Sequence, residues 1–411
     1  MTRSMNDAPA GSSSEDSLPT KIAAVPLVLD DDLMIDVDNE AYENIDIEEE
    51  LVRSRVNAAR TLFHQPRGDN DTVHSNSTRS LYDTDVEYRM INGRRYCGDY
   101  YMPNDDDEQT RMQILHEVYK ALLSKRLTTV PLSSPTKILD VGTGTGDWAI
   151  AMGEQWPECE VVGTDIAKIQ PSAVPLNVFF EIDDAEEEYG WTWPDDEFDL
   201  VHFRHMAGAF SSWSDIYKEA HRSLKPGGWI EVLDFDNHDR TLLSFFAEDS
   251  EVSTWLRTIN ECSQTSGRPR GAAHLEPEVL AGAGFVDINV TEKVIPMGIW
   301  PDNKEDKLLG RHFLVAQLCG IESLCLRPFT EQMGWGVEKI RTLCGQVTDA
   351  VRTVSMDPNS KGLGFTVRIL TGRKPGGPDM AEGDAESVLT ATVNGTNGMN
   401  GGTTTNGNST H

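Results

Sequence analysis

Between residues 137 and 236, short apolar runs alternate with longer segments in which apolar residues recur every three or four positions. The short runs predict buried strands, and the longer segments predict amphipathic helices. Strands are expected at 137–141, 160–166, 178–183, 198–204 and 229–235. Helices are expected at 110–127, 146–156 and 212–224. Strands that alternate with helices predict an α/β fold: a parallel sheet with right-handed crossovers and helices on both faces.

Beyond residue 236 the alternation is less regular. The apolar spacing predicts two more helices at 249–267 and 305–324, and two strand-like segments at 285–300 and 362–375. We expect these two strands to complete the far edge of the sheet. The sequence contains no visible internal repeat.

The two ends of the chain differ in composition from the part between them. Residues 1–80 contain a Ser-rich run and an acidic stretch with interspersed apolar residues, and we expect this region to be largely disordered. A segment that orders on a partner and a solvated tail without a function both fit this pattern. Residues 374–411 are rich in Gly, Asn and Thr, which also predicts disorder. The folded domain is therefore expected at 81–373, with its core at 137–236.

The chain is strongly acidic, because 67 of its 411 residues are Asp or Glu and 36 are Lys or Arg, for a net charge of −31. Such a charge repels nucleic-acid phosphates and anionic lipids, so direct binding of nucleic acid or of a membrane surface is not expected. No stretch of 18 apolar residues occurs, so insertion into a membrane is not expected either. The six cysteines form no C-x-x-C pair. This predicts free thiols in a reducing compartment and no metal site.

A glycine-rich turn follows the first core strand, with the spacing D-x-G-x-G-x-G from Asp140 through Gly142, Gly144 and Gly146. A turn between a strand and a helix presents helix N-terminal N–H groups to a ligand, and glycine lets the backbone approach that ligand. The spacing is neither G-x-G-x-x-G nor a P-loop, and Asp147 beside the turn would repel a pyrophosphate. A cofactor that carries an amino acid and a cationic centre is therefore favoured, with Asp140 accepting hydrogen bonds from its ammonium group.

Polar residues also stand where the next three strands end, and ligands of open α/β sheets bind at the carboxyl ends of the strands. Asp165 ends the second core strand, where a carboxylate can accept hydrogen bonds from both hydroxyls of a ribose. Asp183 and Asp184 end the third strand, where one of them can accept a hydrogen bond from an exocyclic adenine amine. Phe203 and Arg204 end the fourth strand, and we expect them to form the wall nearest the reacting centre.

Five features occur here in one fixed order: the glycine turn, Asp165, EIDDA (181–185), FDLVHFRHM (198–206) and LKPGGWIEVLDF (224–235). In this order they resemble the class I S-adenosylmethionine-dependent methyltransferases. The resemblance covers 137–236 and implies a Rossmann-like sheet, S-adenosylmethionine as the cofactor and methyl transfer as the reaction. The candidate cofactor-binding residues are Asp140, Gly142, Gly144, Gly146, Asp165, Asp183, Asp184, Phe203 and Arg204.

The upstream segment 87–119 is similar to the segment that precedes the glycine turn in fungal LaeA-like proteins. It contains an aromatic stretch with a glycine, a proline, an acidic cluster and an Arg-x-x-x-x-His spacing formed by Arg111 and His116. Covering the cofactor and lying on the protein surface are both compatible with these two residues. The resemblance implies a nuclear or cytoplasmic regulator of secondary metabolism and development. Its implied partners are velvet-type regulators or a related methyltransferase.

Methyl transfer mainly needs alignment of the donor and the acceptor, and it needs a base only where the acceptor must lose a proton. His205, at the exit of the fourth strand, is the candidate general base. Strand alternation places His205 on the face of Phe203, and His202 on the face of Arg204. The sequence favours the alternative interpretation of His205, a structural histidine that caps the next helix.

The exit of the fourth strand reads FRHM, and so it lacks the Asn/Asp-Pro-Pro-aromatic motif of methyltransferases that modify amino groups of nucleic acids. Together with the acid excess, this argues against a DNA base as the methyl acceptor. The sequence therefore predicts a regulatory S-adenosylmethionine-dependent methyltransferase. A small-molecule O-methyltransferase of a natural-product pathway and a cofactor-binding scaffold with little turnover stay open as alternatives.

Overall fold

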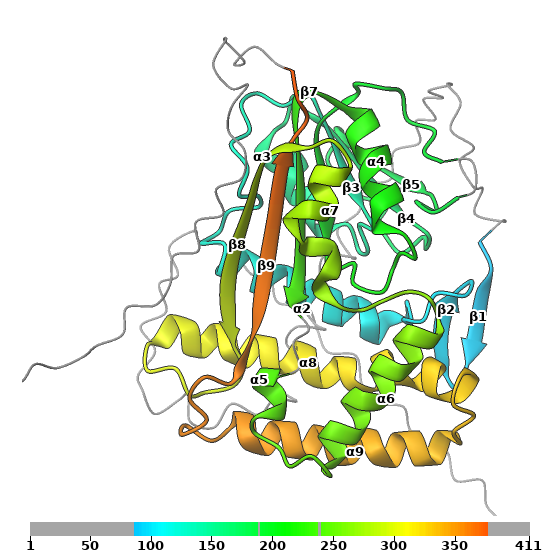
Figure 1. The fold of residues 1–411 in the computed structure, drawn as a ribbon, viewed down its shortest axis with the longest axis vertical. Helices are drawn as coiled ribbons and strands as arrows, with labels where there is room; N and C mark the ends of the chain where they lie inside the picture. The colour runs from blue at the N-terminus through cyan, green and yellow to red at the C-terminus, as the bar shows by residue number, and fades with distance from the viewer. Residues whose placement is uncertain (1–85, 188–189, 237–239, 377–411) are drawn as a thin grey trace, which may run out of the picture. The chain divides into compact units, whose positions relative to one another are not determined.

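The computed structural model describes residues 86–187, 190–236 and 240–376, and the ribbon in Figure 1 shows their arrangement. The expectation for residues 1–80 lies outside the described residues, as does nearly all of that for 374–411. Among the described helices, none combines the length and the apolar composition that crossing a membrane requires.

The main element is a seven-stranded sheet with the order β5-β4-β3-β6-β7-β9-β8. The strands are β1 (Tyr88–Ile91), β2 (Arg94–Cys97), β3 (Lys137–Val141), β4 (Glu160–Asp165), β5 (Val178–Ile182), β6 (Phe198–Arg204), β7 (Leu224–Asp236), β8 (Val286–Pro296) and β9 (Gly364–Arg373). β5, β4, β3, β6 and β7 are parallel, and β9 runs antiparallel to both β7 and β8. The predicted parallel sheet is confirmed, and so is the position of the last two strands at its far edge.

Helices cover both faces of the sheet and its lower end in Figure 1. They are α2 (Asp106–Leu122), α3 (Asp147–Gln155), α4 (Trp213–Ser223), α5 (Arg240–Leu243), α6 (Glu251–Thr265), α7 (Pro277–Gly282), α8 (Lys304–Glu331) and α9 (Val337–Ser355). α3 packs on β4 and β5, whereas α4 and α7 cover the opposite face. α2, α6, α8 and α9 lie below the sheet in Figure 1 and share one hydrophobic core with the end of β7.

The helix expected at 110–127 begins earlier than the apolar spacing predicts. Asp105 is its N-cap, and its carboxylate accepts a hydrogen bond from the backbone N–H of Glu108. The acidic side chains of the first turn, Asp106 to Glu108, also interact favourably with the positive end of the helix dipole. The acidic cluster is therefore a helix start.

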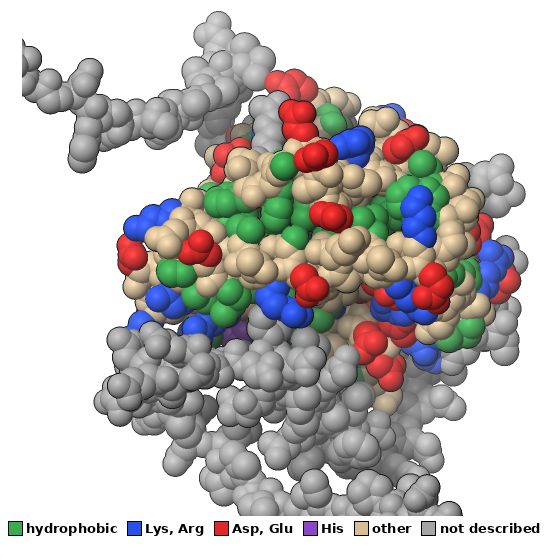
Figure 2. All heavy atoms as spheres, turned by 90° about the horizontal axis from the view of Figure 1, so that it is seen from below, with side chains coloured by type: hydrophobic (Ala, Val, Ile, Leu, Met, Phe, Trp, Pro, Cys, Tyr) green, Lys and Arg blue, Asp and Glu red, His purple; other side chains and the backbone are tan. Residues whose placement is uncertain are grey.

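The helix expected at 305–324 is confirmed as part of α8, which is longer and has buried side chains around much of its circumference. Such a helix is enclosed by other elements, and α2, α6 and α9 pack against it. α9 was not predicted from the sequence. Figure 2 shows the molecule from below, where acidic and basic side chains are mixed and apolar side chains form a band between them. The described part of this face is therefore not uniformly acidic.

Candidate functional site

A cavity of about 750 Å³ lies at the carboxyl ends of β3, β4, β5, β6 and β7. Its walls continue into α2, α6, α8 and α9, and into the segment 97–104 between β2 and α2, which we call the strap. This volume is within the range of small-molecule and cofactor sites, and the position is the one that open α/β sheets use for ligands. The sheet order thus brings the predicted strand ends to one cavity.

The glycine turn at the end of β3 uses left-handed backbone angles at all three glycines, with φ of +70° at Gly142, +59° at Gly144 and +81° at Gly146. Gly142 and Gly144 line the cavity. A Cβ on Gly146 would meet the ring of Phe180 at 2.4 Å, and Gly146 is not among the residues that line the cavity. Gly146 is therefore needed for packing at the start of α3, and its expected contact with the ligand is not supported.

Asp165 lies at the end of β4 against the glycine turn and lines the cavity. Its Oδ2 accepts a hydrogen bond from Gly144 N at 2.9 Å, and its Oδ1 accepts one from Ala167 N at 2.9 Å. Burial raises the pKa of Asp165 to about 6, and these backbone donors partly oppose that rise. Each oxygen has a further lone pair, so the carboxylate is held in orientation by the backbone and can still accept hydrogen bonds from a ligand.

Asp183 and Asp184, which follow β5, also line the cavity, and β4 lies between β5 and β3 in the sheet. Burial raises the pKa of Asp183 to about 6, with additional repulsion from Glu187 and Asp184. Asp184 Oδ1 accepts a hydrogen bond from the backbone N–H of Glu186 at 3.0 Å. The sheet therefore brings Asp165, Asp183 and Asp184 into the same cavity, as expected from the strand ends.

Asp140, at the start of the glycine motif, also lines the cavity, but both of its oxygens already have partners in the chain. His202 Nδ1 lies 2.7 Å from Oδ1, and Thr143 Oγ1 donates to Oδ2 at 2.7 Å. The His202 ring in turn stacks on the Trp148 indole, with ring centroids 3.7 Å apart. Asp140 thus connects β3, β6, the turn and α3, a role that the sequence did not predict.

Phe203 and Arg204 were both expected to line the ligand site, and only Arg204 does. Phe203 is fully buried with its ring packed edge-on against Trp213 and Phe210, and it does not line the cavity. Arg204 does line it, and its guanidinium lies over the Tyr119 ring with 5.2 Å between Cζ and the ring centroid. The expectation for Phe203 was wrong because alternation along β6 turns this side chain into the core beneath α4.

Arg204 also contacts His116, with 3.3 Å between its Nη2 and His116 Nδ1. Burial and the neighbouring Arg204 charge lower the pKa of His116 far below its usual value, so this imidazole is neutral. Burial likewise lowers the pKa of Arg204. Both residues line the cavity, and the surface interpretation of His116 is wrong.

His205 lines the cavity directly after β6, but it no longer follows the strand alternation. Its φ is +60°, so the backbone turns there into the left-handed region, and the ring packs edge-on against Phe235. Its Nδ1 is buried without a hydrogen-bond partner among the described residues. Burial and the nearby Arg111 charge lower the pKa of His205 to about 4. The N-cap of the next helix is Ser212, so the helix-capping interpretation of His205 is wrong.

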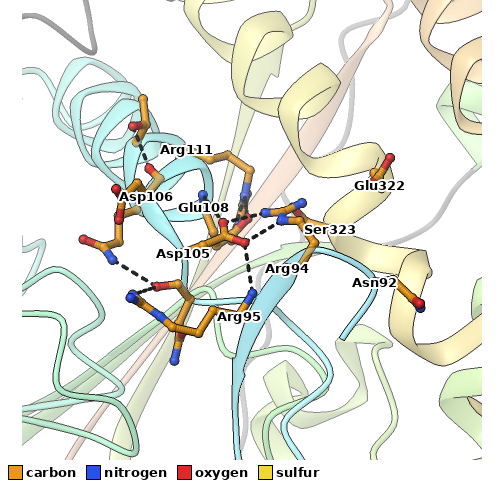
Figure 3. Close-up of polar contacts among 12 residues, drawn as sticks. Asn92, Arg94, Arg95, Asp105, Asp106, Glu108, Arg111, Glu322 and Ser323 are labelled. Carbon is orange, nitrogen blue, oxygen red and sulfur yellow. Dashed lines mark hydrogen bonds and ion pairs between the residues drawn. The ribbon is translucent and has the colours of Figure 1, made fainter. Parts of the chain in front are cut away.

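The start of α2 joins the β1–β2 hairpin and α8 through the polar contacts drawn in Figure 3. Arg94 donates to both oxygens of Asp105, at 2.5 and 2.8 Å, and to Ser323 Oγ at 3.2 Å. One turn further along α2, Arg111 and Glu108 form an ion pair of 2.6 Å, with only 6% and 0% of their side chains exposed. Both line the cavity, so the surface interpretation of Arg111 is also wrong.

The strap covers the cavity and is tied to elements on two sides. Arg327 of α8 donates to the carbonyl oxygens of Gly98 and Tyr100, each at 2.9 Å. Tyr101 donates from its hydroxyl to the carbonyl oxygen of Ala207 at 3.1 Å. The strap therefore forms one wall of the cavity at the strand ends, which the sequence did not predict.

Asp234 is a cavity residue that the sequence interpretation missed. Its Oδ1 accepts a hydrogen bond from Phe235 N at 2.9 Å and its Oδ2 accepts one from Met206 N at 3.0 Å, while His274 Nε2 lies 3.4 Å from Oδ2. The signal was present, because Asp234 stands near the end of the fifth predicted strand, where the rule applied to the other strands also holds.

Comparison with known proteins agrees with this geometry. Residues 113–271 match a family described as a methyltransferase domain. The chain is 34% identical over 305 residues to methyltransferase pytC of Aspergillus terreus, covering 73% of this chain and 92% of that protein.

Two regulators are similar to the chain as well. It is 34% identical to the secondary metabolism regulator LAE1 of Cochliobolus heterostrophus, over 60% of this chain and 83% of that protein. It is 30% identical to the secondary metabolism regulator laeA of Aspergillus fumigatus, over 68% of this chain and 76% of that protein. The chain therefore belongs to the LaeA-like family of class I S-adenosylmethionine-dependent methyltransferases.

Proposed function

We propose that the cavity binds S-adenosylmethionine between the glycine turn and the ends of β4 and β5. The observation that carries this assignment is the pairing of an open turn with a half-buried carboxylate, that of Asp165. A Cβ on Gly144 would have only the flexible end of Met112 close by, at 3.2 Å, so the backbone there is open to a ligand. Asp165, oriented by Gly144 N, lies directly beside it.

Each polar group of the cavity has a matching part of the cofactor. Asp165 accepts hydrogen bonds from the ribose hydroxyls, and Asp183 or Asp184 accepts one from the adenine amine. The backbone of Gly142 and Gly144 lies against the amino-acid part, and the carboxylates of Asp140 and Asp165 favour its ammonium group. The acidic surroundings also suit a sulfonium and would repel a pyrophosphate.

The bound cofactor supplies a methyl group on a positively charged sulfur, which is transferred in line to a nucleophile. The chain itself aligns the acceptor and excludes water, since the strap and the four lower helices enclose the site. Nε2 of His205 is the atom to which the acceptor proton passes, because Nδ1 is enclosed. Its lowered pKa keeps the ring neutral and able to accept a proton at neutral pH, but it makes His205 a weak base that suits an acidic acceptor group.

We further propose that the protein regulates secondary metabolism and development in a fungal host. Its support is the pair of relatives named as secondary metabolism regulators. Protein partners, velvet-type regulators or a related methyltransferase, and action in the nucleus or cytoplasm belong to this proposal. The acidic, partly apolar composition of residues 1–80 is compatible with a partner-binding segment.

Two measurements test the proposal at its two levels. Calorimetry with the complete chain should show S-adenosylmethionine binding, and a wild-type chain that does not bind it refutes the cofactor assignment. Deletion of the gene in its native host should change the profile of secondary metabolites, and wild-type protein should restore it. Restoration by Gly144→Asp, a variant designed not to bind the cofactor, would instead favour a scaffold with little turnover.

A further inference from the structure

The cavity has a second part, which we call the helical chamber and which is formed by side chains of α6, α8 and α9. Its lining residues are Trp255, Leu256, Ile259, Asn260, Cys262, Ser263, Ala316, Gln317, Gly320, Ile321, Leu324, Pro328, Val347 and Val351. No charged side chain lines the cavity from these three fully described helices. The charged lining residues come instead from the strap side, α2, the strand ends and the loop after α6.

The carboxylates that line the cavity from α2 and β7 have partners within the chain. Glu108 is paired with Arg111, whose Cδ lies 3.4 Å from the position of a Cβ on Gly320 of α8. Asp234 accepts two backbone hydrogen bonds and faces His274. A lysine or arginine side chain entering the helical chamber would therefore lose its hydration without gaining a carboxylate partner, which is costly.

An apolar molecule gains from the same surroundings. Many of the chamber residues belong to the largest hydrophobic cluster of the described chain, among them Trp255, Ile259 and Val351. Burying apolar surface against such walls contributes roughly 25 cal/mol per Å². The chamber and the strand-end region form one continuous cavity, so an occupant of the chamber reaches the place where the methyl donor is proposed to lie.

We infer that the methyl acceptor is an apolar small molecule with a hydroxyl group, whose body occupies the helical chamber and whose oxygen lies beside His205. This inference rests on the proposed function and specifies its substrate class. His205 supplies a second observation that points to a ligand, because it lines the cavity and is only half-buried. Its Nδ1 is the enclosed nitrogen of the ring, which leaves Nε2 as the nitrogen accessible from the cavity.

The proposed methyl transfer balances in bonds, electrons and protons. The acceptor oxygen forms a bond to the methyl carbon as the bond from that carbon to the sulfonium breaks, and the bonding pair remains on sulfur as a neutral thioether. The hydroxyl proton passes to Nε2 of His205. No oxidant, reductant or metal ion enters the step.

A filled-chamber variant tests the inference on the complete chain. Ala316 of α8 and Val351 of α9 both line the chamber and are 0% and 5% exposed. The double variant Ala316→Leu with Val351→Phe places larger apolar side chains there, and Ala316→Leu alone is the milder version. Leu308→Phe, on the same helix at a position that is 41% exposed and outside the cavity, is the matched control.

The first readout is the fluorescence of N-phenyl-1-naphthylamine, a neutral apolar dye, added to protein saturated with S-adenosylhomocysteine. Wild type and Leu308→Phe should bind the dye equally, whereas the double variant should bind it at least tenfold more weakly. Calorimetry should give the same S-adenosylmethionine affinity for all of them, which shows that the fold and the donor part are intact. Equal dye binding by the double variant would overturn the inference.

The second readout identifies the acceptor class. Native-host extract is incubated with the protein and S-adenosylmethionine that carries tritium in its methyl group, and the label is counted in the solvent-extractable fraction and in precipitated protein. Label in the extractable fraction that falls at least tenfold with the double variant supports an apolar small-molecule acceptor. Label in the protein fraction instead overturns it while leaving the proposed methyl transfer intact, and absence of cofactor binding refutes the proposed function itself.

Discussion

Replacement of Gly144 by aspartate is the most direct test of the glycine turn, because the position separates backbone strain from contact with the ligand. Gly144 has φ of +59°, and a Cβ there would meet only Met112 Sδ, at 3.2 Å. An aspartate at a left-handed position costs about 1 kcal/mol, since the Cβ approaches the carbonyl oxygen. A domain of this size tolerates that loss, so Gly144→Asp should fold.

The effect on the cofactor should be larger than the effect on the fold. The new carboxylate would extend into the cavity beside Asp165, which already accepts the N–H of residue 144 at 2.9 Å. Two unit charges about 5 Å apart repel by roughly 3 kcal/mol at an effective dielectric constant near 20. This repulsion would protonate one of the two carboxyls or turn the Asp165 carboxylate away from residue 144, and either change removes the acceptor that the ribose hydroxyls are proposed to use. The loss of two charge-assisted hydrogen bonds of about 1.5 kcal/mol each corresponds to a loss of affinity of about 100-fold.

Calorimetry with S-adenosylmethionine and thermal unfolding measure the two effects separately. Gly334→Asp is the matched control, because Gly334 has φ of +65°, lies outside the cavity, and a Cβ there would meet no described heavy atom within 4 Å. Gly144→Ala adds the strain without the charge and should lose less affinity than Gly144→Asp. Gly144→Asp and Gly334→Asp should unfold at similar temperatures, because both add an aspartate at a left-handed position. If Gly144→Asp then bound S-adenosylmethionine with an affinity within threefold of wild type, the cofactor assignment would be refuted.

Three further predictions concern single residues of the site and the core. His205→Ala should lower the methyl-transfer rate by about 100-fold at saturating acceptor while the calorimetric cofactor affinity stays unchanged; an unchanged rate would leave His205 a structural role only. Because burial raises the pKa of Asp165 to about 6, only about a tenth of this carboxyl is ionised one pH unit lower. The affinity of the wild type for S-adenosylmethionine should therefore fall between pH 7 and pH 5. Asp165→Asn should bind the cofactor more weakly at neutral pH, and its affinity should change less with pH. An equal pH dependence of the two affinities would contradict the role of Asp165. Phe203→Leu should lower the free energy of unfolding in urea by about 1 to 3 kcal/mol without changing cofactor affinity, since its ring lies in the core; a variant that loses affinity but not stability would return Phe203 to the site.

The strand ends were predictable because two local signals agree there. Short apolar runs gave the strands of the core, and the sheet order then brought Asp165, Asp183 and Asp184 to one cavity without any further information. The same rule would have found Asp234. Sequence period and strand order are sufficient for these polar residues at the carboxyl ends of the strands, whereas the apolar Phe203 near the end of β6 points into the core.

His205 shows where the local signals end. Alternation requires extended backbone angles, and the left-handed φ of +60° at this residue breaks it one position beyond the strand. A non-glycine residue rarely adopts this conformation, so no pattern of residue types indicates it. The helical chamber was not predictable for a different reason. It depends on how α6, α8 and α9 pack, and the spacing of apolar residues predicts that a helix has a buried face without naming the element that covers it.

The contacts of Asp140, which begins the glycine motif, show that this residue fixes the conformation of the turn. Asp140 holds Thr143 of the turn through one oxygen and His202 of β6 through the other, and His202 stacks on Trp148 of α3. Three left-handed glycines at alternate positions are conformationally free in an unfolded chain, so an unsupported turn would have to be ordered when the ligand binds. Here the buried Asp140 contacts fix the turn beforehand. Binding then loses less conformational entropy, which means that Asp140 contributes to cofactor affinity by preorganising the backbone of Gly142 and Gly144 in addition to its charge.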